Sequence, residues 1–317
     1  EHSTAMAGYI AGSGGVAKEA SILSAYLYGV MDEEIEWMLD NDVDIINMSF
    51  GELVPTGVYD SDAAYADYIV NQYKVTVVAA AGNEGEGTGY VCNPSLGYNV
   101  ISLGAANDGV ARSPYSSYIE AEGSAPKPTL MLVGSYVANI PLDVMYSGTS
   151  VSSACASGII ALLMEQHPNL KTNPEKLQAL LCSSARMHPD AILLPNGFNE
   201  PTGAGMIHYE NFNTQYAGDG TYFIASSSVA AGKSATFTSI NSLVSGVYMV
   251  NLYARCFSGR APIDITINGT TYYLEPLEMP SSNDASTQAN QFYYMLIIKC
   301  KIRNEKGIYD IRNYLIA

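Results

Sequence analysis

Short apolar runs alternate with stretches of helical spacing through the first two thirds of the chain. The runs that predict strands are residues 20–27, 43–49, 75–80 and 100–105. Residues 33–39 and 62–73, which lie between them, predict helices. Apolar strands joined by helices are typical of a parallel sheet covered by helices on both faces. We therefore expect an α/β fold whose functional groups gather at the carboxyl ends of the strands.

The strongest helical signal covers residues 150–166. This stretch is nearly free of charge, with small residues early and Ile, Leu and Met later. A helix that is apolar on all sides belongs in a core, and Pro168 ends it. A second helix is expected to begin at Asn173 and Pro174, a capping residue followed by proline, and to run to about Ala185.

The pattern changes after about Gly218, where helical spacing fades. Runs rich in Tyr, Val, Ile and Thr then alternate with turn residues at 221–225, 234–240, 246–256, 263–273, 290–301 and 307–314. Such short strands predict an all-β module, a sandwich or jelly roll. We therefore expect two domains, an α/β domain over residues 1–217 and an accessory all-β domain over residues 218–317.

Composition excludes several classes of protein. The 317 residues are 48% hydrophobic and 15% charged, which indicates a substantial core. An excess of 31 acidic over 15 basic residues, with a net charge of −16, argues against nucleic acid or an anionic membrane as partner. The five cysteines are irregularly spaced and form no cluster with histidine. We therefore expect no metal site and no cofactor.

Three short blocks carry the candidate chemistry, and their order along the chain is informative. The first is His2-Ser3-Thr4-Ala5-Met6-Ala7-Gly8, the second is Ala79-Ala80-Ala81-Gly82-Asn83-Glu84-Gly85, and the third is Ser147-Gly148-Thr149-Ser150-Val151-Ser152-Ser153. They supply an imidazole, a side-chain amide behind a glycine, and a serine at the start of a helix. A general base, an oxyanion donor and a nucleophile are the groups that cleave an acyl bond.

In this order and with these flanks, the blocks resemble the subtilisin-like serine proteases, or subtilases. The resemblance covers roughly residues 1–210 and implies a subtilisin-like parallel sheet, peptide-bond hydrolysis, and secretion or exposure at the cell surface. It assigns Ser150 as nucleophile, His2 as general base, and Asn83 with the Ser150 N–H as oxyanion hole. The chain departs from the family pattern at Ser3, Ala154 and Cys155.

Each assigned residue also has a purely structural interpretation. Ser150 could be a simple helix cap, Asn83 a turn residue, and His2 an exposed residue without a role. Ser150 at the start of a buried helix, and Asn83 directly after an apolar strand, favour the functional interpretation. For His2 the resemblance alone supplies the argument.

The resemblance also indicates where a peptide substrate binds. Ser49, Phe50 and Gly51 resemble the strand that pairs with an extended substrate, whereas Ala80, Ala81 and Gly82 resemble the wall of the specificity pocket. Main-chain pairing gives affinity for any unfolded peptide, and pockets set the preference. Phe50 suggests apolar or aromatic substrate side chains.

The family's triad also contains an aspartate on a strand before the histidine, and the sequence contains no counterpart to it. We expect an N-terminal fragment, retained non-covalently after a cut just before the helix of His2, to bring this strand and its aspartate to the sheet. Glu1 adjoins His2 and cannot easily reach the ring nitrogen that faces away from the serine. The alternative is an inactive pseudo-protease, or a binding module that retains the protease shell.

Overall fold

The computed structural model describes residues 1–26, 31–52, 57–85, 87–107, 111–119, 127–189, 191–192 and 199–217, together with five strands between residues 246 and 313. A four-stranded parallel sheet lies at the centre of the first part, in the order β1-β2-β3-β4. Its strands are β1 (Ile45–Met48), β2 (Thr76–Ala80), β3 (Ile101–Ala106) and β4 (Leu130–Val133). The predicted parallel sheet is confirmed.

The register of the sheet brings two of the candidate segments level with each other. Met48, the last residue of β1, pairs with Ala79 of β2. The chain leaving β1 at Ser49 and the chain leaving β2 after Ala80 therefore emerge at the same carboxyl edge. This is the edge at which α/β proteins place their sites.

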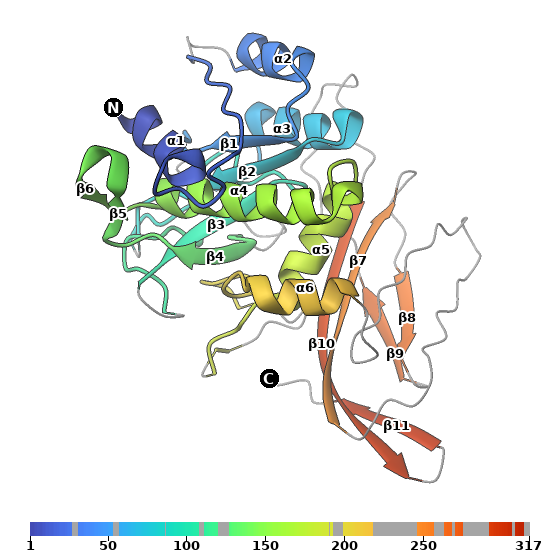
Figure 1. Cartoon of the computed structure of the whole chain (residues 1–317). Helices are drawn as coiled ribbons and strands as arrows, with labels where there is room; N and C mark the ends of the chain where they lie inside the picture. Colours follow the sequence, from blue (N-terminus) through green and yellow to red (C-terminus); the bar gives the residue numbers. More distant parts are fainter. Residues whose placement is uncertain are drawn as a thin grey trace.

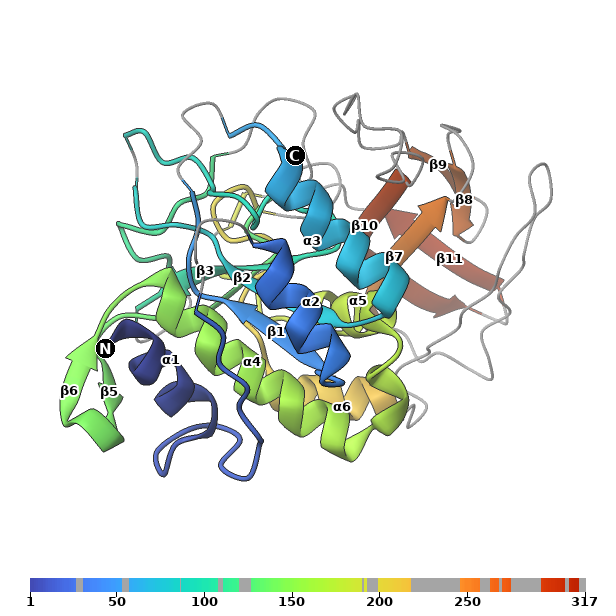
Figure 2. The same cartoon turned by 90° about the horizontal axis from the view of Figure 1, so that it is seen from above.

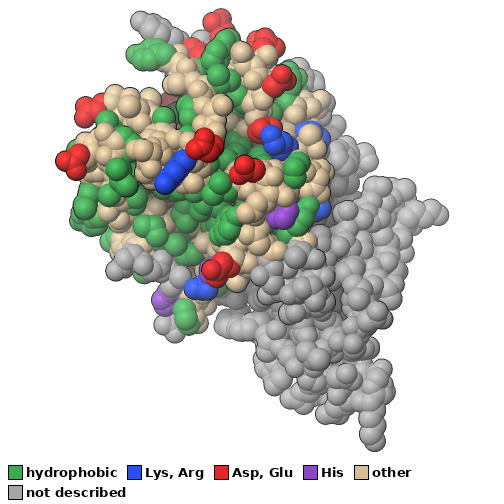
Figure 3. Space-filling model, in the orientation of Figure 1, with side chains coloured by type: hydrophobic (Ala, Val, Ile, Leu, Met, Phe, Trp, Pro, Cys, Tyr) green, Lys and Arg blue, Asp and Glu red, His purple; other side chains and the backbone are tan. Residues whose placement is uncertain are grey.

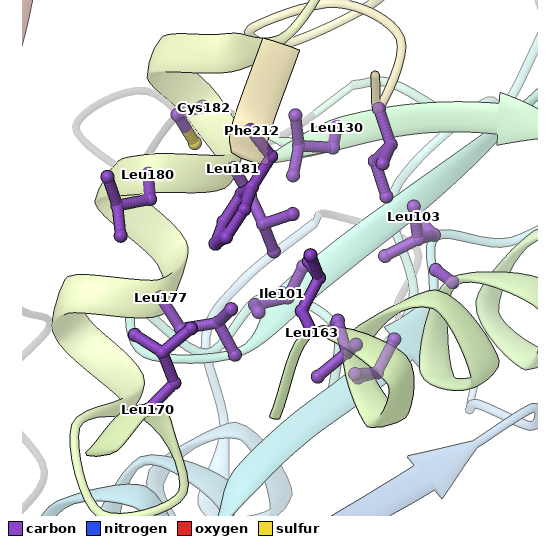
Figure 4. Packing of buried hydrophobic residues seen from close by; sticks show 14 of the residues in the cluster. Ile101, Leu103, Leu130, Leu163, Leu170, Leu177, Leu180, Leu181, Cys182 and Phe212 are labelled. Atoms are coloured by element: carbon purple, nitrogen blue, oxygen red, sulfur yellow. The ribbon is translucent and has the colours of Figure 1, made fainter. Parts of the chain in front are cut away.

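Helices cover both faces of the sheet (Figures 1 and 2). On one face lie α4 (Thr149–Gln166), α5 (Pro174–Ser184) and α6 (Tyr209–Ala217), whose apolar residues pack on β2, β3 and β4 (Figure 4). On the other face, α2 (Asp32–Asp40) and α3 (Ser61–Tyr73) pack on Ile46, Met48, Val77 and Ala79. Successive side chains of each strand point to opposite faces, and both faces are covered by helices. The strands are therefore buried on both sides, which explains their nearly continuous apolar sequence.

The helix α4 runs along the middle of the domain, as its apolar sequence predicted. Small residues in its first turns allow α1 (His2–Ala11) to pack closely against it, with Ala5, Met6 and Tyr9 meeting Val151 and Ala154. Two hydrogen bonds attach α1 to the hairpin formed by β5 (Val137–Asn139) and β6 (Val144–Tyr146). Asn139 Nδ2 donates to Ala5 O at 2.9 Å, and Tyr9 Oη donates to Val137 O at 2.7 Å.

The predicted buried strand over residues 20–27 is wrong for the part that the structure describes. Residues 20–26 form no strand, and Ile22, Leu23 and Tyr26 are exposed by 41%, 41% and 78%. Leu27 lies outside the described residues. The physical reason is the lack of a partner, because a strand in a parallel sheet needs a neighbour with which to share its hydrogen bonds. Among the described residues, no strand pairs with the outer edge of β1 either.

Every described element after residue 217 is a strand. β7 (Gly246–Cys256), β10 (Phe292–Glu305) and β11 (Ile308–Asn313) form an antiparallel sheet in the order β11-β10-β7, and β8 (Ile263–Ile267) pairs with β9 (Thr270–Leu274). These strands overlap four of the predicted runs, and β9 and β10 extend beyond the predicted ends at residues 273 and 301. The runs at 221–225 and 234–240 lie outside the described residues, and the sandwich or jelly roll and the domain boundary at 217/218 stay predictions.

Candidate active site

Ser150 lies in the first turn of α4, directly opposite the end of β1. Its Oγ donates a hydrogen bond to Ser49 O at 3.0 Å, so the single hydroxyl proton goes to a backbone carbonyl. The first N–H groups of a helix have no acceptor within the helix, and the helix dipole favours negative charge at this end. Ser150 therefore lies at the beginning of a buried helix, as the sequence predicts.

The side chain of Asn83 is held against the same helix end. Its Oδ1 accepts hydrogen bonds from Thr149 N at 2.9 Å and from Thr149 Oγ1 at 3.1 Å. A backbone N–H can only donate, so this contact fixes which end of the amide is oxygen. The donor end, Nδ2, is thereby turned away from Thr149 and left to face another acceptor.

One side-chain donor, the amide of Asn83, and one backbone donor, the N–H of Ser150, approach the same point beside Gly148. A Cβ built on Gly148 would lie 3.7 Å from Asn83 Nδ2, 3.7 Å from Asn83 Oδ1 and 3.7 Å from Ser150 N. Because residue 148 is glycine, this space stays open. The side-chain amide of Asn83 and the N–H of Ser150 thus border the same small volume beside Gly148.

Thr149 connects the two blocks in a way that the sequence did not indicate. It is fully buried, and its Oγ1 accepts from Gly82 N at 3.1 Å while donating to Asn83 Oδ1. Gly82 has a φ of +114°, a conformation that side chains disfavour. The turn that carries Asn83 is therefore tied directly to the first turn of α4.

A ladder of small polar side chains runs beneath Ser150, from β1 into α4. Ser49 Oγ donates to Ser150 O at 2.9 Å and contacts Ser153 Oγ at 2.9 Å, and Asn47 Nδ2 donates to Ser49 Oγ at 2.9 Å. Ser157 Oγ lies 3.2 Å from Asn47 Oδ1. The sequence analysis missed Asn47 and Ser157. The spacing of Ser150, Ser153 and Ser157, three and four residues apart on one helix face, was the available signal.

His2 begins α1, and its side chain is exposed. Since α1 packs on the first turns of α4, His2 and Ser150 open two neighbouring helices, and both views place these beginnings at the same end of the domain (Figures 1 and 2). The structure does not join the two side chains by a hydrogen bond, because the Ser150 proton is donated to Ser49 O.

Asp67 is a buried carboxylate on α3, and it serves a loop rather than the site. It accepts from Tyr59 Oη, Tyr98 N and Asn99 N at 3.0, 2.9 and 2.5 Å. Burial raises the pKa of the Asp67 carboxyl above its ordinary value, and these hydrogen bonds oppose that rise. With its oxygens so engaged, Asp67 does not supply the carboxylate that would orient His2.

The described residues contain no cluster of metal ligands and no helix of membrane-spanning length and apolarity. In the described part of the chain, no three His, Cys, Asp or Glu side chains are arranged to hold a metal ion. No helix in the described ranges is long and apolar enough to cross a bilayer. On the face shown in Figure 3, acidic side chains are scattered rather than gathered in one patch.

Comparisons with known proteins agree with the geometry. Residues 1–205 match the family model described as "Subtilase family". Subtilisin NAT of Bacillus subtilis subsp. natto is 33% identical over 187 residues, which cover 53% of this chain and 46% of that protein. Subtilisin of Bacillus pumilus is also 33% identical over 187 residues, which cover 53% of this chain and 64% of that protein. The chain thus spans less than two thirds of the length of these relatives.

Among solved structures, the fold is similar to that of the prenylagaramide maturation protease PagA. The TM-score is 0.54 at 22% identity, and the match covers 67% of this chain and 81% of that chain. At this level of identity the likeness concerns the fold alone.

Proposed function

Because this chain belongs to the subtilase family, a family of serine proteases, we propose that it is a serine endopeptidase in which Ser150 is the nucleophile and His2 the general base. Asn83 Nδ2 and the Ser150 N–H form the oxyanion hole. The observation that carries the proposal is the common position of these two donors, each 3.7 Å from one point beside Gly148, at the beginning of the helix that carries Ser150. Donors fixed in advance toward a developing charge are the largest single contribution in acyl transfer.

The reaction follows from these positions. Ser150 Oγ attacks the substrate carbonyl while His2 takes its proton, and the tetrahedral oxyanion is held by Asn83 and the Ser150 N–H. The C–N bond then breaks as His2 gives the proton to the leaving amine, which leaves an acyl-enzyme. Water, deprotonated by the same imidazole, hydrolyses the ester and restores the Ser150 hydroxyl.

An extended peptide binds along the two backbone segments at the carboxyl edge. The carbonyl of Ser49 accepts the N–H of the substrate residue whose carbonyl is attacked, in place of the Ser150 hydroxyl. Gly51, and the segment of Ala80, Ala81 and Gly82, flank that residue's side chain. The register that levels β1 with β2 supports this arrangement.

A further strand, which carries the orienting aspartate, pairs with the outer edge of β1. Two observations support it: no described strand occupies this edge, and the apolar side chains of Ile22 and Leu23 are left exposed. Unpaired buried backbone groups each cost about 1–3 kcal/mol. We propose that a non-covalent N-terminal fragment supplies the strand, and native mass spectrometry of the purified complete protein should reveal it as a second, smaller polypeptide.

One observation favours a second candidate function. The Ser150 proton is donated to Ser49 O and His2 is exposed, as in a binding module that keeps the protease shell without turnover. Loss of the orienting carboxylate costs about 10⁴ in kcat in serine proteases. Such a module would bind extended peptides and leave them intact.

A fluorophosphonate probe distinguishes these functions. It should label the complete protein at Ser150, and Ser150→Ala should abolish the labelling. Ser147→Ala is the matched control, because Ser147 is exposed three residues earlier in the same block. Labelling that survives in Ser150→Ala, or peptide binding without any labelling, would contradict the proposed nucleophile.

A further inference from the structure

The two proposed peptide-binding segments are joined by a third segment that passes beneath them. Cys92 N donates to Ala81 O at 3.0 Å, and Cys92 Sγ donates to Ala80 O at 3.3 Å. The next residue, Asn93, exchanges two backbone hydrogen bonds with Glu52, at 3.0 and 3.2 Å. Residues 92–93 therefore connect the chain leaving β1 to the chain leaving β2.

The sulfur of Cys92 fills the space between those two chains. A Cβ on Gly51 would lie 2.3 Å from Cys92 Sγ, far inside van der Waals contact, and a Cβ on Gly82 would lie 3.6 Å from it. Cys92 is only 4% exposed, so the sulfur is in contact with protein on nearly every side. Glycine at both positions is what allows the thiol to occupy this space.

We propose that Cys92 forms the base of the specificity pocket and limits the substrate residue whose carbonyl is attacked (P1) to a small uncharged side chain such as Gly, Ala or Ser. This inference rests on the proposed function, because it assumes that residues 49–51 and 80–82 flank that side chain. It departs from the expectation of apolar or aromatic side chains drawn from Phe50, a residue that is 43% exposed.

The chemistry of the pocket supports this preference. The thiol proton is already donated to Ala80 O, so the sulfur presents a weakly polar surface with no charge to pair with Lys, Arg, Asp or Glu. A large ring would have to displace a side chain that is held on three sides. Since interiors are close-packed, such a displacement costs more than a single contact repays.

A panel of peptide substrates that differ only at P1 tests the proposal on the complete protein. The wild type should show a kcat/KM at least about 10-fold higher for P1 Ala than for P1 Phe, since each misfitting methylene in a pocket costs about 10-fold or more. Cys92→Gly should raise kcat/KM for P1 Phe by about 10-fold or more. Cys92→Ser, of nearly the same size, should keep the order of the wild type, as should Cys182→Ala, which removes a buried thiol of α5 remote from the site.

Two outcomes would overturn the proposal: a wild type that cleaves after Phe as well as after Ala, or a Cys92→Gly protein with an unchanged order. If circular dichroism shows that Cys92→Gly is unfolded, the wild-type panel and Cys92→Ala, which opens the pocket less, decide the question.

A binding measurement separates this inference from the proposed function. Peptides ending in Ala or Phe at P1 are titrated into Ser150→Ala, with or without the Cys92→Gly change, and read by calorimetry. A preference for Ala that is lost with Cys92→Gly supports the pocket even if the wild type proves inactive. Equal binding of both peptides by Ser150→Ala overturns the pocket even if Ser150 proves to be the nucleophile.

Discussion

Ser49 and Ser150 hold each other through two hydrogen bonds: Ser150 Oγ donates to Ser49 O at 3.0 Å, and Ser49 Oγ donates to Ser150 O at 2.9 Å. One bond uses the nucleophile's own hydroxyl and the other uses its backbone. The end of β1 therefore fixes both the position of the first turn of α4 and the direction of the Ser150 side chain. A peptide bound as we propose would take the Ser49 carbonyl and thereby release the Ser150 hydroxyl for reaction.

Ser49→Ala should remove the hydrogen bond from Ser49 Oγ to Ser150 O and keep the one from Ser150 Oγ to Ser49 O. The carbonyl stays, and Ser153 Oγ still donates to Ser150 O, whereas Asn47 Nδ2 loses its acceptor, Ser49 Oγ. Buried polar groups left unpaired cost about 1–3 kcal/mol, so urea unfolding should show a loss of that size. In steady-state kinetics, kcat should fall more than KM rises, because the change shifts the nucleophile rather than the peptide-binding edge.

Ser157→Ala is the control, since Ser157 lies at the far end of the same ladder. It should lower the free energy of unfolding with little effect on kcat. Equal losses of kcat in both variants would contradict a specific role of Ser49 in positioning Ser150, and no loss of kcat in either would indicate that the ladder acts on stability alone.

Loss of the Asn83 amide should slow acylation without preventing binding. Asn83→Ala is expected to lower kcat by about 10²–10³, the loss known for subtilisin when it loses this donor. Asn83→Asp keeps an oxygen for Thr149 but has no N–H to offer the oxyanion, so it should be equally impaired. Pre-steady-state measurement of the acylation burst reports this directly, and an active Asp variant would exclude the amide from the oxyanion hole.

Thr149→Val should disturb the position of Asn83 while keeping the shape of the core. The variant loses the hydroxyl that accepts from Gly82 N and donates to Asn83 Oδ1. We expect a decrease in kcat of roughly 10-fold, corresponding to about one hydrogen bond, and a loss of stability of about 1–3 kcal/mol. Thr149→Ser, which retains the hydroxyl, should restore most of both. Failure of Ser to rescue would point to the methyl group instead.

Three thiols, of which Cys92 and Cys182 are buried and Cys155 is half-buried, should make stability depend on alkaline pH. Burial raises the pKa of Cys92 and Cys182 to about 12 and that of Cys155 to about 11, whereas an unfolded thiol ionises near pH 8.5. The unfolded state therefore releases protons first, and the stability that these thiols confer below about pH 8.5 is lost as the pH rises toward 11–12. The free energy of unfolding should fall over this range.

Comparison with Cys182→Ala isolates one thiol from the other groups that titrate at high pH. The gap in unfolding free energy between wild type and variant should narrow between pH 8 and pH 10. A constant gap would mean that Cys182 ionises in the folded state as it does in the unfolded state.

The sheet and its helices could be predicted because local pattern and tertiary position agree there. Residues 75–80 form a buried strand in any context that covers both faces, and α4 is apolar all round because it crosses the core. The positions of Ser49 and Gly82 followed from the same reasoning, since both come directly after strands.

Contacts across the sequence could not be predicted in this way. That Thr149 holds Asn83, or that Cys92 lies under Gly51, depends on how segments more than 40 residues apart meet. Residues 20–26 are wrongly predicted as a strand, because their apolar sequence is that of a strand but no strand that the structure describes pairs with them. The hydrophobic pattern indicates which secondary structure a segment prefers, but it does not show whether a partner strand is present.

The outer edge of β1 would link assembly of the sheet to activity. The strand that we propose to bind there would pair beside Ser49, whose carbonyl accepts the Ser150 hydroxyl proton. Occupancy of this edge and the position of the proposed nucleophile would then be coupled through a single residue. Peptidase activity would therefore report whether the edge is filled, separately from whether the remaining sheet is folded.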